Sequence, residues 1–171
     1  MGGTIYSIGH GTATAEDFVR TLTDMGARLL ADIRSAPDSR RNPPFGAGRL
    51  RDTLALSGIE YVHLPGLGGR RAPRADSANT GLRVAAFRGY ADHMASDEFR
   101  ADLTRLEEYA RLAPAAFMCA ETLWWKCHRR LLADRMTADG WRVVQLRVGR
   151  PAEPHRLTDA ARVEQGRLSY D

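Results

Sequence analysis

The chain has 171 residues, which suits one domain with a core of its own. Hydrophobic residues make up 43% of it and no apolar run approaches the roughly 18 residues of a membrane helix, so the composition speaks against both a disordered chain and a membrane-spanning one. The net charge of +4 comes almost entirely from arginine, because Lys126 is the only lysine. Two interpretations of this excess of arginine stay open. It can reflect a GC-rich genome, which favours arginine codons, or it can serve an anionic partner, because the guanidinium group binds phosphate bidentately.

The chain contains two cysteines, Cys119 and Cys127, which fit a reducing compartment. They have no third or fourth partner at zinc-ligand spacing, so the sequence predicts neither a metal nor a cofactor. The first residues lack the basic and apolar segments of a secretory signal, and we therefore expect a cytoplasmic protein without a membrane partner.

Strands and helices alternate through the first half of the chain. A strand at residues 4–8 is followed by a helix that Thr14 caps and Gly26 ends. A largely apolar strand follows at residues 28–33, then a long loop at 34–46 and a short helix that Gly58 ends.

The same alternation continues in the second half. The pattern predicts strands at residues 60–64, 115–119 and 142–146, with helices at 84–94, 97–112 and 126–139 and a second long loop at 65–81. Beyond Gly149 the pattern weakens, and a short helix is expected near residues 159–164.

This order predicts one α/β domain over residues 1–171, with a core at about 4–148 and a C-terminal extension at 149–171. The expected architecture is a three-layer sandwich, in which a mostly parallel sheet of about five strands carries helices on both faces. In such sheets ligands bind outside the carboxyl ends of the strands. The residues at and just after the carboxyl ends of the predicted strands are therefore expected to face one crevice: His10, Asp32, Arg34, His63, Gly66, Gly68, Gly69, Cys119 and Glu121.

Five segments resemble motifs of a known family, and the resemblance runs in order from about residue 5 to residue 146. They are Ser7–Thr12 (SIGHGT), Asp32–Ser35 (DIRS) with Ser39–Pro43 (SRRNP), Tyr61–Leu64 (YVHL) with Leu67–Gly69 (LGG), Phe87–Ala91 (FRGYA), and Met118–Glu121 (MCAE) with Cys127–Arg129 (CHR). The chain resembles the domain of unknown function 488 family, although members usually carry Asp-Pro where it has Leu123 and Trp124. The resemblance implies a compact parallel α/β fold and a polar pocket, without a settled activity.

Two carboxylates are candidates for acid–base chemistry. Glu121 and Asp32 follow different strands, and two acids in unlike surroundings can divide the general acid and base roles. For Asp32 the structural alternative is a salt bridge to Arg34 or Arg129. For Glu121 it is a helix cap or a structural pair. Glu121 is the better catalytic candidate because it follows a strand directly.

Two histidines complete the catalytic candidates. His10 lies between two glycines, and His128 lies at a helix start, where the dipole favours a neutral imidazole. Either histidine can instead be a structural hydrogen-bonding residue. A nearby helix terminus and cations would lower a thiol pKa, but Cys119 is better explained as a buried structural thiol than as a nucleophile.

The remaining candidates bind substrate. The arginines suit phosphate, the glycines allow a close backbone approach, and the aromatic residues can stack a base or fill the core. The candidates are Arg34, Ser35, Arg40, Arg41, Gly68, Gly69, Tyr90, Trp124, Trp125 and Arg129.

Three function classes follow from these residues. The first is an enzyme that hydrolyses the N-glycosidic bond of a modified or damaged base, with nucleic acid, chiefly double-stranded DNA, as its partner. The second is an enzyme or binding module for a small phosphorylated or anionic metabolite. The third is a protein-binding module without chemistry, which the clustered acids and histidines disfavour.

Overall fold

The computed structural model describes residues 2–38 and 40–171, so Ser39 of the second motif lies outside the described residues. The central sheet contains β1 (Thr4–Gly9), β2 (Leu29–Asp32), β3 (Glu60–His63), β4 (Ala115–Cys119), β5 (Arg142–Leu146) and β6 (Glu153–Pro154) in the order β3-β2-β4-β1-β5-β6. The first five of these strands are parallel, and only β6 pairs antiparallel. The five predicted strands and the mostly parallel sheet are confirmed.

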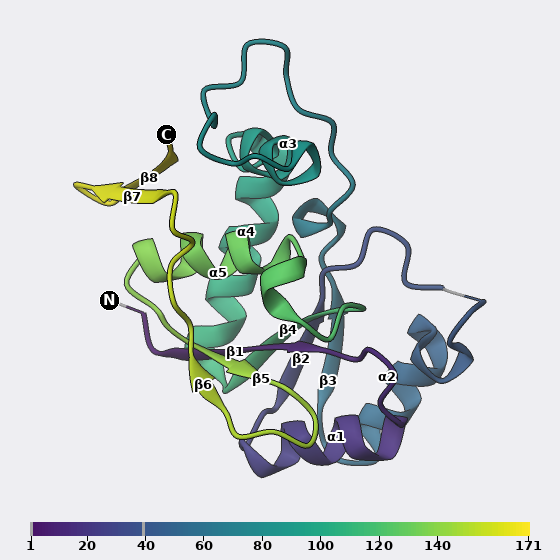
Figure 1. Ribbon diagram of the computed structural model, residues 1–171. Helices are drawn as coiled ribbons and strands as arrows, with labels where there is room; N and C mark the ends of the chain where they lie inside the picture. Colours follow the sequence, from purple (N-terminus) through teal and green to yellow (C-terminus); the bar gives the residue numbers. More distant parts are fainter. Residues whose placement is uncertain (1, 39) are drawn as a thin grey trace.

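Five α-helices cover the two faces of this sheet (Figure 1). On one face lie α1 (Ala15–Asp24) and α2 (Ala47–Ala55), and on the other lie α3 (Ala85–His93), α4 (Asp97–Leu112) and α5 (Arg129–Ala138). Three short 3₁₀ helices, η1 (Pro43–Phe45), η2 (Pro65–Leu67) and η3 (Trp124–Lys126), lie in the connections. The predicted three-layer sandwich is therefore confirmed.

Side-chain alternation along the strands builds a core on each face. Leu29 and Ala31 of β2 pack on the side of α4 and α5, whereas Leu30 packs on the side of α1 and α2. Strand β4 divides in the same way: Phe117 faces the first core and Met118 the second. All five strand residues of β4 are buried, as expected of a central parallel strand.

Two helix starts behave as their sequences predict. The hydroxyl of Thr14 accepts the Asp17 N–H at 3.1 Å before α1, and that of Ser96 accepts the Phe99 N–H at 3.2 Å before α4. Within the described part of the chain, no helix is both long enough and apolar enough to cross a membrane.

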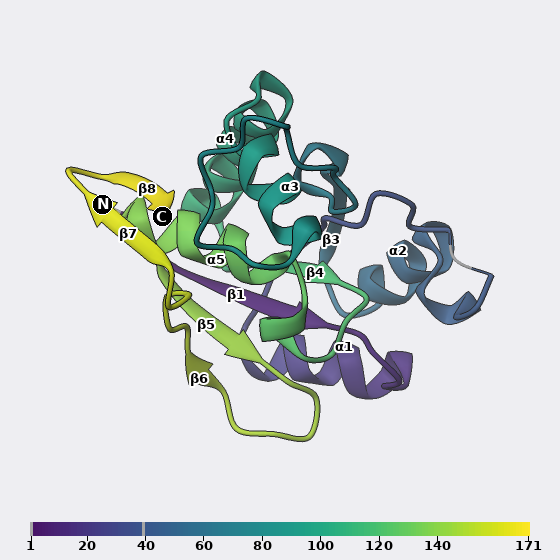
Figure 2. The same ribbon diagram turned by 45° about the horizontal axis from the view of Figure 1, so that its top comes forward.

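The C-terminal extension departs from prediction. The prediction of a short helix near residues 159–164 is wrong. This segment forms β7 (Ala161–Glu164), which pairs with β8 (Arg167–Tyr170). Gln165 and Gly166 join them with φ of 51° and 76°, the backbone of a tight two-residue hairpin turn. The hairpin projects on the opposite side of the molecule from α2 (Figure 2).

A buried carboxylate on α5 anchors this extension. Asp134 accepts hydrogen bonds from His155 Nε2 at 2.8 Å, the Thr158 N–H at 3.1 Å and the Tyr170 hydroxyl at 2.9 Å. Because Asp134 and the side chain of His155 are almost wholly inaccessible to water, these polar groups can form their hydrogen bonds only with one another.

We predict that Asp134→Ala lowers the free energy of unfolding by about 3 kcal/mol, because it leaves buried donors without an acceptor. Urea denaturation measures this change. The matched control is Asp24→Ala, at an exposed acidic residue, which should change stability by less than about 0.5 kcal/mol. Equal effects of the two substitutions would contradict the anchoring role.

Candidate active site at the carboxyl edge of the sheet

The loops that follow the central strands meet at one edge of the sheet. The N–H of His10 donates to the Cys119 carbonyl at 3.1 Å, and that of Gly11 donates to the Ala120 carbonyl at 2.8 Å. In the neighbouring strands, Asp32 is in register with His63 and with Met118. The predicted constellation is thus brought to a single edge, on the right-hand side of Figure 1.

Asp32 is wholly buried and holds Arg34. Its two carboxylate oxygens accept Arg34 Nε at 3.0 Å and Nη2 at 2.7 Å, and the Tyr61 hydroxyl donates to it at 2.6 Å. Burial opposes the charge of Arg34, but Asp32 outweighs it and raises the pKa of the guanidinium. Of the alternatives considered for Asp32, the structure therefore places it in the salt bridge, in a position that orients Arg34.

Arg129 is also wholly buried, in the first turn of α5. Its Nε donates to the Ser7 hydroxyl at 2.8 Å, and its Nη1 donates to Cys119 Sγ at 2.7 Å and to the Glu121 carbonyl at 2.8 Å. Arg129 thus joins β1, β4 and the loop after β4 from within. Ser7 was not among the predicted residues, although a serine inside an apolar strand was a signal for it.

The two cysteines lie against each other, with their Sγ atoms 2.8 Å apart. Burial alone would raise the pKa of Cys119, but the hydrogen bond with Cys127 and the charge of Arg129 together lower it to about 6. The hydrogen bond to Cys119, together with burial, raises the pKa of Cys127. These opposite pKa shifts make Cys119 the thiol of the pair that ionises first and Cys127 the one that donates to it.

His128 lies beside this pair, with Nδ1 3.5 Å from Cys127 Sγ. Burial and the charges of Arg129 and Arg71 lower its pKa to about 4, so the imidazole is neutral, as predicted. A Cβ at Gly69 would lie 2.6 Å from His128 Nδ1, so this close approach requires glycine. His128 Nε2 is buried and has no partner among the described residues.

His10 and Glu121 lie at the ends of the two central strands. The His10 ring stacks on Phe45, with centroids 4.4 Å apart and planes at 9°, and its Nδ1 is 3.0 Å from the Gly11 carbonyl. Burial lowers the pKa of His10, and the Gly11 hydrogen bond offsets this only in part. Glu121 is exposed, and its Oε1 accepts the Leu123 N–H at 3.1 Å.

Some predicted binding residues have internal roles. Tyr90 is wholly buried and donates to the Leu67 carbonyl at 2.9 Å, so it lies in the core beneath this edge. The Ser35 hydroxyl donates to the Gly69 carbonyl at 3.1 Å, and a Cβ at Gly68 would lie 2.3 Å from that hydroxyl. These contacts fix the loop after β3 against the loop after β2.

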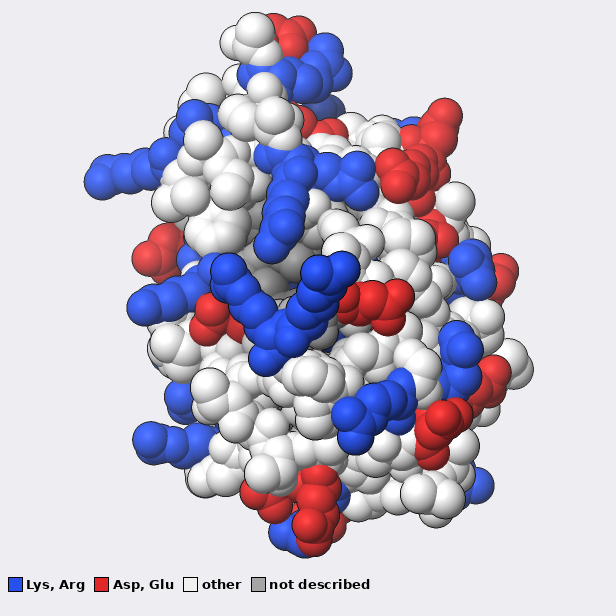
Figure 3. Space-filling view, turned by 90° about the vertical axis from the view of Figure 1, so that its right-hand side faces the viewer, with Lys and Arg blue, Asp and Glu red and all other residues white. Residues whose placement is uncertain are grey.

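The outer arginines surround the same edge. Arg40 and Arg41 are exposed in the loop after β2, and Arg70 is exposed in the loop after β3. Figure 3 looks onto this side of the molecule and shows Lys and Arg side chains gathered in the middle of the face. Cationic groups therefore lie both inside and around the candidate site.

The paired indoles occupy different environments. Trp124 Nε1 donates to Glu153 Oε1 at 3.0 Å, and its ring packs edge-on against Trp125 and His155. Trp125 is 38% exposed and is the indole of the pair that is open to a ligand.

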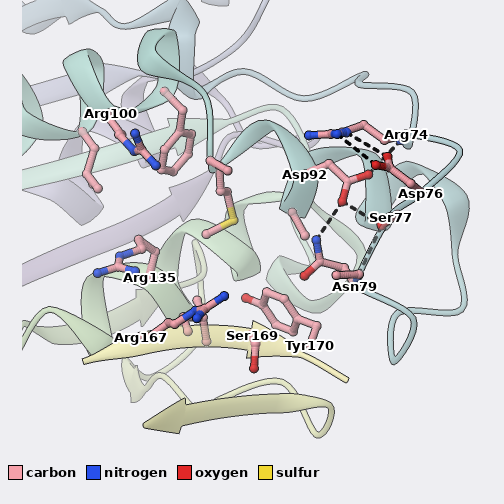
Figure 4. A pocket seen from close by; sticks show the side chains of 17 residues that line it. Arg74, Asp76, Ser77, Asn79, Asp92, Arg100, Arg135, Arg167, Ser169 and Tyr170 are labelled. Carbon is pink, nitrogen blue, oxygen red and sulfur yellow. Dashed lines mark hydrogen bonds and ion pairs between the residues drawn. The ribbon is translucent and has the colours of Figure 1, made fainter. Parts of the chain in front are cut away.

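A cavity of about 790 Å³ lies away from this edge, between the loop at residues 74–79, helices α3 and α4, and the C-terminal hairpin. Figure 4 shows Arg100, Arg135 and Arg167 on one side of it. On the opposite side, Asp92 accepts hydrogen bonds from Ser77 and Asn79. The cavity contains none of the predicted site residues.

We predict that the 240 nm thiolate absorbance of the protein titrates with a midpoint near pH 6 and that Cys127→Ala moves this midpoint toward the ordinary thiol value of about 8.5. The substitution removes the donor that stabilises the charged form. Cys119→Ala is the control and should abolish the transition near pH 6. An unchanged midpoint in Cys127→Ala would contradict the thiol–thiolate pair.

No curated protein and no solved structure matches this chain. The family described as "Domain of unknown function DUF488" matches residues 14–136, well over half of the chain. The matched segment runs from the cap of α1 into α5 and includes Asp32, Glu121 and Arg129. The chain therefore belongs to the domain of unknown function 488 family.

Proposed function

We propose that this protein is an enzyme acting on nucleic acid that hydrolyses the N-glycosidic bond of a modified or damaged base at the carboxyl edge of its sheet. The observation that carries the proposal is the pairing of two neighbouring strand ends: an exposed carboxylate, Glu121, follows β4, and a buried imidazole with a lowered pKa, His10, follows β1. Glycosidic hydrolysis needs a carboxylate near an oxocarbenium-like centre and an activated water.

Glu121 is suited to act as the general base that activates a water molecule. It is exposed, so a ligand can reach it, and Leu123 fixes one of its carboxylate oxygens. Its main chain is held by Arg129 through the carbonyl oxygen. A carboxylate fixed in this way loses little conformational freedom when substrate binds.

His10 suits contact with the base. A carbonyl can only accept, so the contact with Gly11 places the proton of the neutral ring on Nδ1 and makes Nε2 an acceptor. The stacking on Phe45 fixes the plane of the ring. Nε2 can therefore accept a hydrogen bond from a base N–H group.

Buried donors support an anionic ligand. Arg34 Nη1 and Arg129 Nη2 are buried nitrogens without a partner among the described residues, and both come from arginines at this edge. Buried polar groups are nearly always paired, so an oxyanion or water is expected against them. The exposed arginines outside can hold the phosphates that flank an extruded nucleotide.

In the proposed reaction, Glu121 takes a proton from water and the water oxygen bonds to C1′ of the sugar. The glycosidic bond breaks, and its electron pair leaves with the base. The departing base nitrogen takes a proton from solvent, since His10 is neutral at pH 7. The products are the free base and an abasic sugar.

We predict that Glu121→Gln reduces base release at least 100-fold, since it removes the general base, and changes DNA affinity less than twofold. A screen over duplexes that contain modified bases, with chromatographic detection of the free base, measures this. Glu108→Gln, on the exposed face of α4, is the matched control and should keep full activity. The proposal fails if the wild type releases no base from any duplex and binds no DNA at low salt.

We predict that base release is constant above pH 7 and falls as the pH drops below 6.5, where His10 gains a proton. The His10 pKa lies below the ordinary 6.5, so protonation and loss of the acceptor occur only on the acid side. The pH dependence of kcat/KM measures this. Persistence of the same acid limb in His10→Gln would assign the limb to another group, such as Cys119.

A second candidate is an enzyme or binding module for a small phosphorylated or anionic metabolite. The burial of the guanidinium donors favours this function, because Arg129 is wholly buried and Arg34 is only 7% exposed. Salt separates the two functions. Several phosphate contacts of a nucleic acid give a steep loss of affinity with salt, whereas one small anion gives a shallow loss.

A further inference from the structure

A second cavity, of about 590 Å³, lies between η3, the start of α3 and the segment at residues 156–160. Three of the exposed large hydrophobic side chains of the described chain line it: Val84, Trp125 and Leu157, which are 53%, 38% and 40% exposed. Exposed apolar side chains that gather around one concave site mark a binding surface.

Several contacts position the aromatic wall of this cavity, and the Arg147 guanidinium lies over the Trp125 ring, 5.3 Å from its centroid. Trp125 stands at 90° to Trp124, with ring centroids 5.6 Å apart. Trp124 is held by its hydrogen bond to Glu153 and by its edge-on contact with His155. A ring fixed before binding loses little entropy when a planar ligand stacks on it.

The cavity is also cationic. Arg83, Arg130 and Arg156 line it, and Asp159 is the one acidic lining residue in the described chain. The Arg130 guanidinium lies 4.6 Å from the Phe87 ring centroid and donates to the Trp125 carbonyl at 3.2 Å. Aromatic and arginine groups thus alternate around one space.

Two polar atoms in the wall lack a partner. Arg130 Nε and Thr158 Oγ1 are buried and make no hydrogen bond within the described residues. Both residues line the cavity. Buried polar atoms are nearly always paired, so these two are unsatisfied polar atoms of residues that line the cavity.

We propose that this cavity binds an unpaired nucleotide of a nucleic-acid strand, with its base stacked on Trp125 and its phosphates paired with Arg83 and Arg156. Aromatic platforms interleaved with arginines bind single strands in this way. The volume lies within the range of small-ligand sites.

The position of the cavity links it to the carboxyl edge. Trp125 and Glu121 belong to the same loop after β4, and the proposed strand would cross this loop with one nucleotide at Trp125 and the reacting nucleotide at Glu121. The inference deepens the proposed function and rests on it for the place of the reacting nucleotide. The strand binding itself is measured without any chemistry.

The test is a fluorescence anisotropy titration of the full chain with a labelled oligothymidylate of about 12 nucleotides. The unlabelled competitors are the same oligothymidylate, thymidine monophosphate, and polyglutamate with the same charge as the oligothymidylate. We expect Trp125→Ala to weaken binding about tenfold or more, the loss that follows removal of one stacking platform. Trp125→Phe should retain most of the affinity, and it also guards against misfolding of the Ala variant.

The charged wall is tested in the same assay. Arg156→Ala should weaken binding and reduce the slope of log affinity against log salt by about 1. Arg142→Ala, an exposed arginine on β5 outside the cavity, is the matched control and should leave both quantities unchanged.

Three outcomes would overturn the inference: unchanged affinity in Trp125→Ala, competition by polyglutamate as strong as by oligothymidylate, or equally strong competition by thymidine monophosphate. The second outcome would indicate an acidic peptide and the third a free nucleotide. Strand binding that depends on Trp125 without base release from any substrate would sink the proposed reaction and leave the inference standing. Base release by the wild type together with unchanged strand binding in Trp125→Ala would support the proposed reaction and overturn the inference about this cavity.

Discussion

A buried positive charge governs the centre of this molecule. Arg129 is wholly inaccessible, and burial of an unpaired guanidinium costs several kcal/mol. Two of its contacts, the Ser7 hydroxyl and the Glu121 carbonyl, are neutral groups, so the Cys119 sulfur supplies the compensating negative charge. The low pKa of Cys119 is therefore the electrostatic counterpart of the buried arginine, and the neighbouring Cys127 thiol stabilises the same charge.

This arrangement dictates the geometry of the residues around it. A Cβ at Gly9 would lie 1.7 Å from the Glu121 carbonyl oxygen and 2.7 Å from Arg129 Nη1, so the end of β1 must be glycine for the arginine to reach both strands. The thiol pair then serves to hold the loop after β4 from within. This explains why two cysteines, a histidine and an arginine in one short segment do not need to form a nucleophilic site, although their composition suggests one.

The sequence predicts the fold more completely than the contacts of the site. Apolar runs and helical spacing are local properties, so the five parallel strands follow from them, as does the convergence of His10, Asp32 and Glu121 on one edge. Which partner a polar side chain chooses is a tertiary property. Asp32 could have faced the crevice or paired with an arginine, and only packing against Tyr61 and Arg34 decides between them.

The C-terminal hairpin was missed for a different reason. Its strands are four residues each and bury only Tyr170, so their alternation is weak, and the turn at Gln165 and Gly166 is the main local signal. Tyr170, which anchors the hairpin on Asp134, is a single aromatic residue at the end of the chain. Its buried partner lies 36 positions away, beyond the range of any local pattern.

The loop after β4 unites the buried and exposed halves of the candidate site. From within, Arg129 and the two thiols hold its two ends, at Cys119 and Cys127. Toward solvent, the same loop carries the Glu121 carboxylate and, in η3, the Trp125 ring. A loop fixed at both ends keeps its exposed groups at constant separation, which is what a site that positions a strand at one point and reacts with it at another requires. The conspicuous thiols therefore act as a scaffold for the residues to which the proposed chemistry is assigned.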